Sequence, residues 1–543
     1  MWILARPLFL RVRRGFGLKE RGCFAYVGKQ LKQTHTQRNP EVMMTPEFVS
    51  GKSFCVFVRL CELVGERAAA SERADKVERE LFAGLLELGR ELLNEFFIQA
   101  GDGDIGPHLE QSGQILNRLE SLSARNYLSV FGKIEVQRCV YAVRERQATV
   151  APLDERLGMP AREHSYVLQD FMQQFCVNSS FDSSVNSLKE LFGISISKRT
   201  AELLNQDLGE AIGKFRDETK KHEFEHEEEE ILVASLDGKG VPMRGTVEQR
   251  RGISETPMQK HLRKRREGKA DTRAKRRAYA GNGKTPKQMA WVGAVFTVEA
   301  APRTCDDILN EFVGVASKPR PRPVNKRIEA RMTDYIEGAR VNGQDTIFED
   351  VAAQVMERDQ KSQKTLICIM DGQNSLWERQ AAHLPRAIPI LDIFHVSERL
   401  WKAAYCFHRE NSPEAEEFVI KHLKLLLQGR VASVVRSFRA RLSKLSATKK
   451  TKLKAAIRYY HNNKALMKYD EYLAKGYPIA SGVIEGTCRN LINDRMERTG
   501  MRWHIDGAQA MLNTRSAYIN GEWKHMIENR IILEQKRLYG QAV

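Results

Sequence analysis

Three short apolar runs in this chain each lead directly into an aspartate. Residues 231–236 precede Asp237, residues 366–370 precede Asp371, and residues 388–391 precede Asp392. Continuous apolar runs of this length are typical of buried, often parallel, β-strands. In open α/β sheets, ligands bind outside the carboxyl ends of the strands. The sequence therefore predicts an α/β fold with several carboxylates at one edge of its sheet.

A fourth acid, Glu485, follows near the start of a helical segment. The helix dipole there favours the ionised carboxylate, which is the form that binds a metal. A glycine follows both Asp237 and Asp371, which allows a tight turn and leaves room for a ligand. The buried stripe of the helix is expected to consist of Ile484, Cys488, Leu491 and Ile492.

These acids together predict a divalent-metal site, because carboxylates close in space repel one another unless a cation lies between them. Sites made of carboxylate oxygens suit magnesium or manganese. Two such ions about 4 Å apart can clamp the attacking and leaving oxygens of a phosphodiester. A single aspartate at a strand end is more often a helix cap or a turn former, so the hypothesis depends on the combination.

The composition favours nucleic acid as the partner. The chain has 543 residues, 42% of them hydrophobic, a net charge of +18 and a pI of about 9.4. Such a length suggests two to four domains, and such a charge favours an anionic partner. An anionic membrane ranks second, and no apolar run approaches the roughly 20 residues of a membrane helix. None of the nine cysteines forms a Cys-x-x-Cys pair, which fits a reducing cytoplasm and argues against a structural zinc.

Residues 1–120 are predicted to form a helical N-terminal region of unknown role. Residues 76–97 show the apolar spacing of an amphipathic helix. Residues 1–42 differ in composition from the rest, and Met43 or Met44 could be the native start. The first apolar run is broken by Arg6, which argues against a signal peptide.

Residues 121–225 are predicted to bind DNA. Residues 126–141 have the alternation of a β-hairpin with its turn at Gly132. Residues 184–192 and 197–208 then form two short helices separated by Gly193, the outline of a helix-turn-helix. Lys198 and Arg199 would open its recognition helix. An ordinary pair of antiparallel helices has the same outline and remains an alternative.

Residues 226–543 carry the acids and form the predicted catalytic domain. A second strand is expected over 288–298, mostly helix over 303–360, and an almost entirely helical block over 397–475. The stretch 244–287 is strongly basic and poor in apolar residues, so we expect a surface loop that contacts DNA phosphates. A loop that serves only solubility is the alternative. Its densest cluster is Arg263, Lys264, Arg265 and Arg266.

Five segments together resemble the DDE transposases of bacterial insertion sequences, in particular the ISKra type, which is related to Mutator-like transposases. The segments are residues 235–243, 370–372, 391–396, 481–486 and 500–512. The resemblance implies an RNase H-like catalytic domain, a mixed sheet flanked by helices, with an all-α insertion at 397–475. It also implies that Asp237, Asp371 and Glu485 form the catalytic and metal-binding triad for two Mg²⁺ or Mn²⁺ ions.

The same resemblance assigns Asp392 and His395 a supporting role near the site. The rival assignment makes Asp392 the second catalytic acid in place of Asp371, and His395 could instead be a core histidine. Lys239 lies close enough to Asp237 to touch a scissile phosphate, or it is a surface lysine. Further candidates for DNA contact are Arg489, Arg495, Arg498, Arg502 and Trp503. For Arg489 an ion pair with Glu485 is the alternative, and for Trp503 an anchor in the core.

These features lead to one expected function and two alternatives. The chain is expected to be a DNA transposase that cleaves the inverted ends of its element and joins them to target DNA. It would act as at least a dimer, in the bacterial cytoplasm and at the nucleoid. The alternatives are an RNase H-like nuclease without strand transfer and a non-catalytic DNA-binding protein derived from a transposase.

Overall fold

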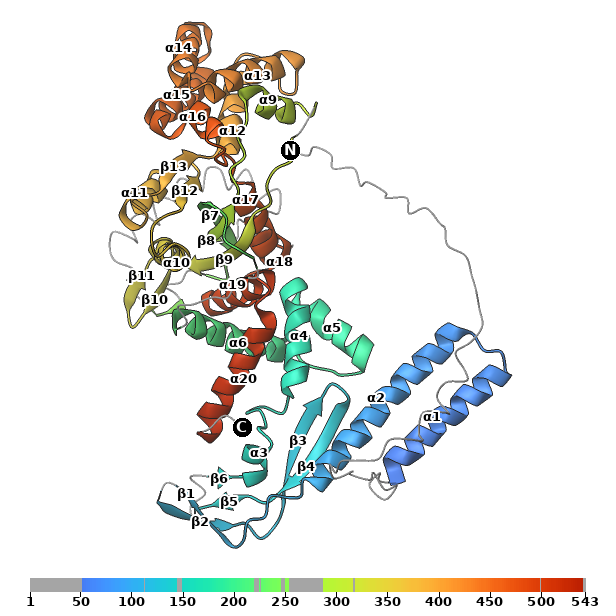
Figure 1. The fold of residues 1–543 in the computed structure, drawn as a ribbon. Helices are drawn as coiled ribbons and strands as arrows, with labels where there is room; N and C mark the ends of the chain where they lie inside the picture. Colours follow the sequence, from blue (N-terminus) through green and yellow to red (C-terminus); the bar gives the residue numbers. More distant parts are fainter. Residues whose placement is uncertain are drawn as a thin grey trace, which may run out of the picture.

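A five-stranded mixed sheet lies at the centre of the molecule (Figure 1). Its strand order is β13-β12-β7-β8-β9, with β8 antiparallel to β7 and β9, and with β12 and β13 parallel to β7. The strands are β7 (Ile231–Pro242), β8 (Lys287–Val298), β9 (Val324–Met332), β12 (Thr365–Met370) and β13 (Ile388–Leu391). The predicted α/β class, with a mixed sheet flanked by helices, is confirmed.

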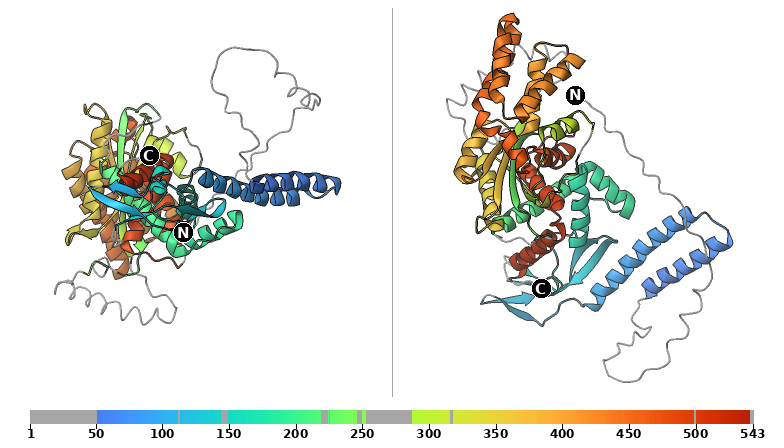
Figure 2. Two further views of the ribbon diagram at one scale, coloured as in Figure 1. Left: turned by 90° about the horizontal axis from the view of Figure 1, so that it is seen from below. Right: turned by 45° about the horizontal axis from the view of Figure 1, so that its top comes forward.

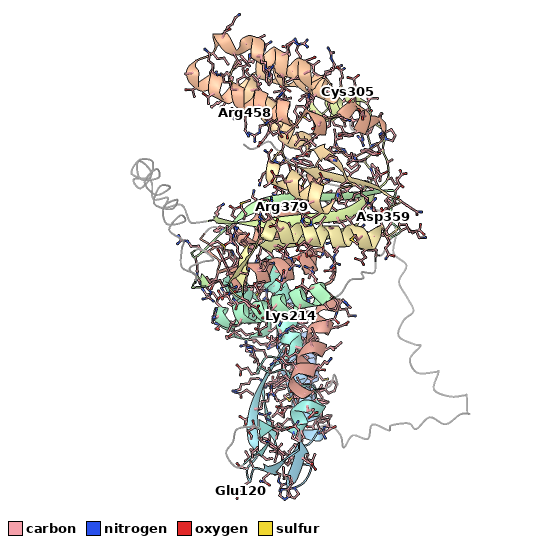
Figure 3. The ribbon with its side chains drawn as sticks, turned by 90° about the vertical axis from the view of Figure 1, so that its left-hand side faces the viewer. Glu120, Lys214, Cys305, Asp359, Arg379 and Arg458 are labelled. Atoms are coloured by element: carbon pink, nitrogen blue, oxygen red, sulfur yellow. The ribbon has the colours of Figure 1, made fainter. Side chains whose placement is uncertain are left out.

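The computed structural model describes residues 51–111, 113–143, 149–218, 224, 226–245, 250–252, 287–315, 318–498 and 500–540. The predictions for residues 1–42 and for Arg263, Lys264, Arg265 and Arg266 lie outside these residues. The molecule is elongated: Figure 3 shows Glu120 near one end, Arg458 near the other and Lys214 between them.

The register between β7 and β12 brings two of the predicted acids together. Ile231 pairs with Thr365, and the ladder continues to Ser235 and Ile369. Two residues further along, Asp237 therefore lies beside Asp371, which follows β12 directly. The expectation that Asp237 ends its strand is wrong, however. β7 continues to Pro242 because β8 pairs with it along its whole length, with Asp237 opposite Val292.

Helices cover both faces of the sheet. On one face, α10 (Gly343–Arg358) and α11 (Asn374–His383) pack on side chains such as Leu232 and Ala234. On the other face lie α12 (Ile393–Ala404), α17 (Gly482–Cys488) and α19 (Ile505–Ile519). Because successive strand residues point to opposite faces, Asp237 shares the face of Ile231 and Val233, beneath α12 and α17.

The prediction of mostly helix over 303–360 is wrong in part. This stretch holds α9 (Cys305–Phe312) and α10, but also β9 and the hairpin of β10 (Asp334–Ile336) and β11 (Ala339–Val341). Strand β9 escaped detection because charged residues occupy its second face. Arg327 and Glu329 are buried as an ion pair, and Arg331 contacts Asp350 of α10 at 2.6 Å.

The block after β13 is entirely helical, as predicted. It continues from α12 through α13 (Pro413–Leu427), α14 (Val431–Arg441), α15 (Ala447–Asn462) and α16 (Tyr469–Ala474), with short 3₁₀ turns at Leu442–Lys444 and Lys464–Leu466. A buried tyrosine ties this block to the sheet, because Tyr469 donates to the carbonyl of Leu391 in β13 at 2.7 Å. Within the block, Tyr460 of α15 donates to the carbonyl of Val396 in α12 at 2.8 Å.

The N-terminal part combines helices with two small sheets. An antiparallel helical hairpin consists of α1 (Gly51–Ala69) and α2 (Ala74–Gln99). The strands that follow are β1 (His108–Gln111), β2 (Gln114–Arg118), β3 (Ser123–Ser129), β4 (Gly132–Arg138), β5 (Tyr141–Ala142) and β6 (Thr149–Val150), and α3 (Pro152–Arg156) comes next. The helix predicted over 76–97 and the β3–β4 hairpin are confirmed. The expectation that 1–120 is only helical is wrong, because β1 and β2 lie within it.

Three helices connect the N-terminal part to the sheet domain. They are α4 (Tyr166–Asn178), α5 (Phe181–Phe192) and α6 (Lys198–Glu218), and Gly193 ends α5 with a φ of 68°. The two predicted short helices therefore exist, the second being longer than expected. Helix α6 packs along α19 so closely that a Cβ atom on Gly209 would overlap Ala510. Helix α20 (Trp523–Tyr539) extends to the segment between α3 and α4, where Tyr539 donates to the carbonyl of Met159 at 2.6 Å.

Among the described residues, no helix combines the length with the apolar character that a membrane span requires.

Candidate metal centre

Four acids and one histidine from four segments meet on one face of the sheet, beneath α12 and α17. Asp237 lies in the middle of β7, and Asp371 directly follows β12. Asp392 caps the N-terminus of α12, which carries His395 in its first turn, and Glu485 lies in the first turn of α17. The strand register places Asp237 beside Asp371, and donor atoms of Asp392, His395 and Glu485 lie within 4.8 Å of one another.

Asp392 is fully buried and its carboxylate is saturated with hydrogen bonds. One oxygen accepts from the backbone N–H groups of Phe394 at 3.3 Å and Ser481 at 2.9 Å. The other accepts from the backbone N–H of His395 at 3.3 Å and contacts its ring Nδ1 at 2.7 Å. Asp392 therefore fixes the start of α12 and, through Ser481, the segment that leads into α17.

His395 interacts with every acid of the cluster. The hydrogen bond from Asp392 raises the pKa of His395 to about 9, and the negative charges of Asp371 and Asp237 act in the same direction. The positive imidazolium in turn lowers the pKa of Glu485 against the other influences on it. Because Nδ1 is engaged with Asp392, Nε2 is the remaining nitrogen of the ring.

Asp237 is half-buried and lies beside a thiol. Its Oδ1 accepts from the backbone N–H of Gly238 at 2.7 Å. Burial raises the pKa of Asp237, and the negative charge of Asp371 raises it further, while a hydrogen bond with Cys488 of α17 lowers it. Lys239 is two residues along the strand, on the same face, and its charge reaches Cys488.

Glu485 projects from α17 while the stripe behind it is buried. Ile484, Cys488, Leu491 and Ile492 are all buried, as predicted. Burial raises the pKa of Glu485, followed by the negative charges of Asp392 and Asp237. A π-helical segment (Arg489–Asn493) follows at once, a local widening that often occurs at functional sites.

The tightest cluster of possible metal ligands differs from the predicted triad. Among the described residues, the donor atoms of Asp392, His395 and Glu485 all lie within 4.8 Å of one another, and Asp237 and Asp371 fall outside that limit. Asp392, however, already accepts from three backbone N–H groups and contacts the imidazole, so no lone pair is left well placed for a cation. Its contacts identify it as the residue that orients His395 and α17.

Tyr459 of α15 is a site residue that the sequence did not reveal. Its hydroxyl oxygen is buried without a hydrogen-bond partner among the described residues, and Asp371 and Asp392 both raise the pKa of the phenol, after the larger effect of burial. The guanidinium of Arg399 lies 5.1 Å from the ring centroid. A Cβ atom on Gly372 would overlap this ring, so the packing of α15 requires the glycine after Asp371.

The candidate DNA-binding residues of two distant segments line one cavity of about 190 Å³. Arg199 of α6 and Arg502 meet there with Arg244, which follows β7. All three are exposed, and among the described residues Arg199 has a single ion pair, with Glu202 at 3.5 Å. Lys198 is also exposed and pairs with Asp182 at 2.9 Å.

Arg495 and Trp503 correct the prediction of a basic, stacking surface at this point. Arg495 is fully buried, with its guanidinium 4.9 Å from the ring of Phe181 and 5.2 Å from that of Trp503. Trp503 is also buried and donates its indole N–H to the carbonyl of Met496 at 3.0 Å. Neither side chain is free to contact DNA in this conformation, because both belong to the core between α4 and α19.

Two further arginines remain on the surface. Arg498 is exposed but donates to the carbonyls of Asp494 and Asn178. Arg489 is exposed, and within the described part of the chain it forms no ion pair with Glu485. Arg489 is therefore the freer of the two for an anionic partner.

In comparisons with known proteins, part of the chain matches a family that has no assigned activity. No curated protein matches the chain. Residues 322–530 match the model of an uncharacterised protein family (UPF0236), a stretch that holds Asp371, Asp392, His395 and Glu485 but not Asp237.

Proposed function

We propose that this protein is a metal-dependent DNA transposase of the DDE type, with Asp237, Asp371 and Glu485 as its catalytic acids. The observation that carries the proposal is the convergence of these acids with His395 on one sheet face, from segments up to 248 positions apart. Clusters of like charge cost stability even where they are only partly buried, as Asp237 and Asp371 are, and such clusters are frequent at functional sites.

The sheet supports an RNase H-like assignment for the catalytic domain. In chain order the strands are β7, β8, β9, β12 and β13, so the observed arrangement is 5-4-1-2-3 with only the second strand antiparallel to the rest. This order brings the first and fourth strands side by side, which is what the resemblance to DDE transposases implies. The helical insertion between the second and third acids agrees with the same resemblance.

The donor set fits Mg²⁺ or Mn²⁺. Asp237, Asp371 and Glu485 supply carboxylate oxygens, the ligands these cations prefer, and Asp371 uses only Oδ1 to accept from the N–H of Gln373. Burial and mutual repulsion raise the pKa of Asp237 and Glu485, and a cation would offset that cost. Two ions bound there would activate water or a 3′-hydroxyl and stabilise the leaving oxygen at phosphorus.

The protein's own groups divide the remaining work. Asp392 orients His395 and the start of α17, and so holds Glu485 over the sheet. The imidazolium of His395 offers a positive charge beside the acids, suited to a phosphate oxygen. Lys239, on the face of Asp237, is placed for the same purpose.

The cavity lined by Arg199, Arg244 and Arg502 supports a DNA path from the N-terminal helices to the metal centre. Arg244 comes seven residues after Asp237, at the end of the same strand region. A backbone phosphate bound there would connect α6 with the catalytic domain, and such contacts act on DNA of any sequence.

The test is cleavage of DNA that carries the ends of the native element, in Mg²⁺, by the wild type and by Asp237→Asn, Asp371→Asn and Glu485→Gln. Loss of cleavage by at least about 100-fold in each variant, with DNA binding retained, supports the triad. The matched control is Asp306→Asn, an exposed acid on α9 that pairs only with Lys424. Unchanged cleavage by Asp237→Asn would refute the assignment.

Pre-cut ends separate the transposase from a nuclease of the same fold. Joined products from pre-cut ends and a target plasmid indicate strand transfer. Cleavage without joining indicates a nuclease, and DNA binding without either reaction indicates a non-catalytic derivative. The pre-cut substrate removes the first step, so it isolates the joining reaction.

A further inference from the structure

The helical hairpin of α1 and α2 carries an apolar surface that the rest of the described chain covers only in part, where the ring of Phe131 packs on Gly89 and the ring of Phe192 lies near that of Phe82. The helices pack on each other through a buried stripe on α1, Ser53, Val56 and Leu60, and Gly84 of α2 makes room for Leu60. Beside that stripe, six large apolar side chains are 45–57% exposed: Phe54, Phe57, Val64, Phe82, Leu85 and Leu92. Figure 2 shows the hairpin extending away from the rest of the molecule in both views.

The exposed side chains have the spacing of a coiled-coil seam. On α1 the positions 54, 57, 61 and 64 alternate steps of three and four residues, and on α2 the positions 82, 85, 89 and 92 do the same. That spacing keeps one stripe of each helix facing a partner helix. The buried stripe of α1 already uses one seam for α2, so the hairpin has a second seam, which Phe131 covers at Gly89 and which is exposed at Phe82, Leu85 and Leu92.

The two open seams lie on the same side of the hairpin. Val64 and Ala68 of α1 and Leu81, Phe82 and Leu85 of α2 line one shared groove. A partner seated on this groove would contact both helices at once. The exposed surface ends at the body of the protein, where the ring of Phe82 comes within 6.4 Å of that of Phe192 in α5.

We propose that this surface binds the same surface of a second copy of the chain, so that two hairpins form a four-helix bundle. The three phenylalanines, each about half exposed, offer on the order of 300 Å² of apolar surface. Val64, Leu85 and Leu92 add to this area, and each partner of a stable interface buries about 800 Å². A two-fold interface needs a self-complementary patch, and the hairpin combines a continuous apolar seam with flanking charges of both signs.

The charge of the hairpin favours self-association over an anionic partner. Residues 51–99 contain seven Lys and Arg and nine Asp and Glu, although the whole chain carries +18. A slightly acidic surface is repelled by DNA and by anionic lipid, whereas mixed charges allow pairing between like hairpins. The inference is independent of the proposed reaction and holds whether or not the chain cleaves DNA.

The test is the mass of the full chain in solution, by light scattering after gel filtration, at a concentration of about 10 μM. The wild type is expected at twice 62.1 kDa, and Phe57→Glu combined with Leu85→Glu at 62.1 kDa with an unchanged circular dichroism spectrum. The control is Arg79→Glu, which also adds negative charge to α2 but lies about 120° round the helix from Leu85 and should remain dimeric. A monomeric wild type, or a double variant that stays dimeric, would overturn the proposal.

Discussion

The ring Nδ1 of His395 lies 2.7 Å from a carboxylate oxygen of Asp392, and that carboxylate also accepts from the backbone N–H of Ser481. One buried side chain thus connects α12 with the segment that opens α17. The proposed metal centre depends on this connection, because Glu485 is only four residues beyond Ser481.

Asp392→Ala is expected to destabilise the fold by about 2–4 kcal/mol, because it removes a helix cap and leaves buried N–H donors unpaired. Urea unfolding of the metal-free protein measures the change. Asp371→Ala is the comparison, since its carboxylate caps only the turn at Gln373. Equal losses for both variants would contradict the orienting role of Asp392.

Asp237→Asn is expected to keep or raise the melting temperature of the metal-free protein, because it removes a buried charge that Asp371 repels. In the wild type, millimolar Mg²⁺ or Mn²⁺ should raise the melting temperature by several degrees, and in the variant this shift should disappear. Thermal scans with and without the ion test both statements. A full shift in Asp237→Asn would exclude Asp237 as a ligand.

Gly372→Ala is expected to lower both stability and DNA cleavage, because the new methyl group overlaps the ring of Tyr459. Tyr459→Ala would make room for it, so the double variant should lose about 1–2 kcal/mol less than the sum of the single changes. A double-mutant cycle in urea measures this coupling. Strict additivity would show that the turn after Asp371 does not depend on α15.

DNA affinity is expected to depend on the rim of the arginine cavity and not on its buried member. Arg244→Gln and Arg502→Gln should each weaken binding and reduce the slope of log K against log salt by about 1. Arg495→Met should leave that slope unchanged, because the guanidinium is enclosed by Phe181 and Trp503. Fluorescence anisotropy at several salt concentrations distinguishes the two cases.

The helical insertion is expected to lose stability below neutral pH through His422. Its ring is buried against Phe418, and burial lowers its pKa below the ordinary 6.5. Below about pH 6.5 the unfolded chain then binds more protons than the folded chain, so the stability decreases as the pH decreases. The melting temperature of His422→Gln should fall less between pH 7 and pH 5 than that of the wild type. His461→Gln, at an exposed position of α15, should behave like the wild type.

The sequence predicted the parts of this protein that are governed by local patterns. The apolar runs before Asp371 and Asp392 are strands, and the block 397–475 is helical. Strand β9 was missed because Arg327, Glu329 and Arg331 are neutralised by distant partners such as Asp350 and Glu522, and no local pattern reveals such pairs. The end of β7 was misplaced because its pairing with β8 outweighs the glycines at 238 and 240.

The site itself was predictable only in part. Asp237, Asp371, Asp392, His395 and Glu485 were all named from strand ends, a helix start and the resemblance to transposases. Tyr459 was not, since in sequence it is one more aromatic residue on an apolar helix face. Arg495 was placed on a surface because its charge does not reveal enclosure by Phe181, which is more than 300 positions away. For Trp503 the burial agrees with the alternative of an anchor in the core.

The sheet has a step at the face that carries the acids. β12 stops at Met370, while β7 runs on to Pro242, and in the described chain that margin of β7 has no neighbouring backbone until Met243 bridges Trp503. Asp237 occupies the inner corner of this step, with β8 as a fixed wall behind it. The length of β12 is therefore under tighter constraint than its composition. Two inserted residues that extended the pairing of β12 with β7 would cover this corner and exclude any substrate, even with every acid intact.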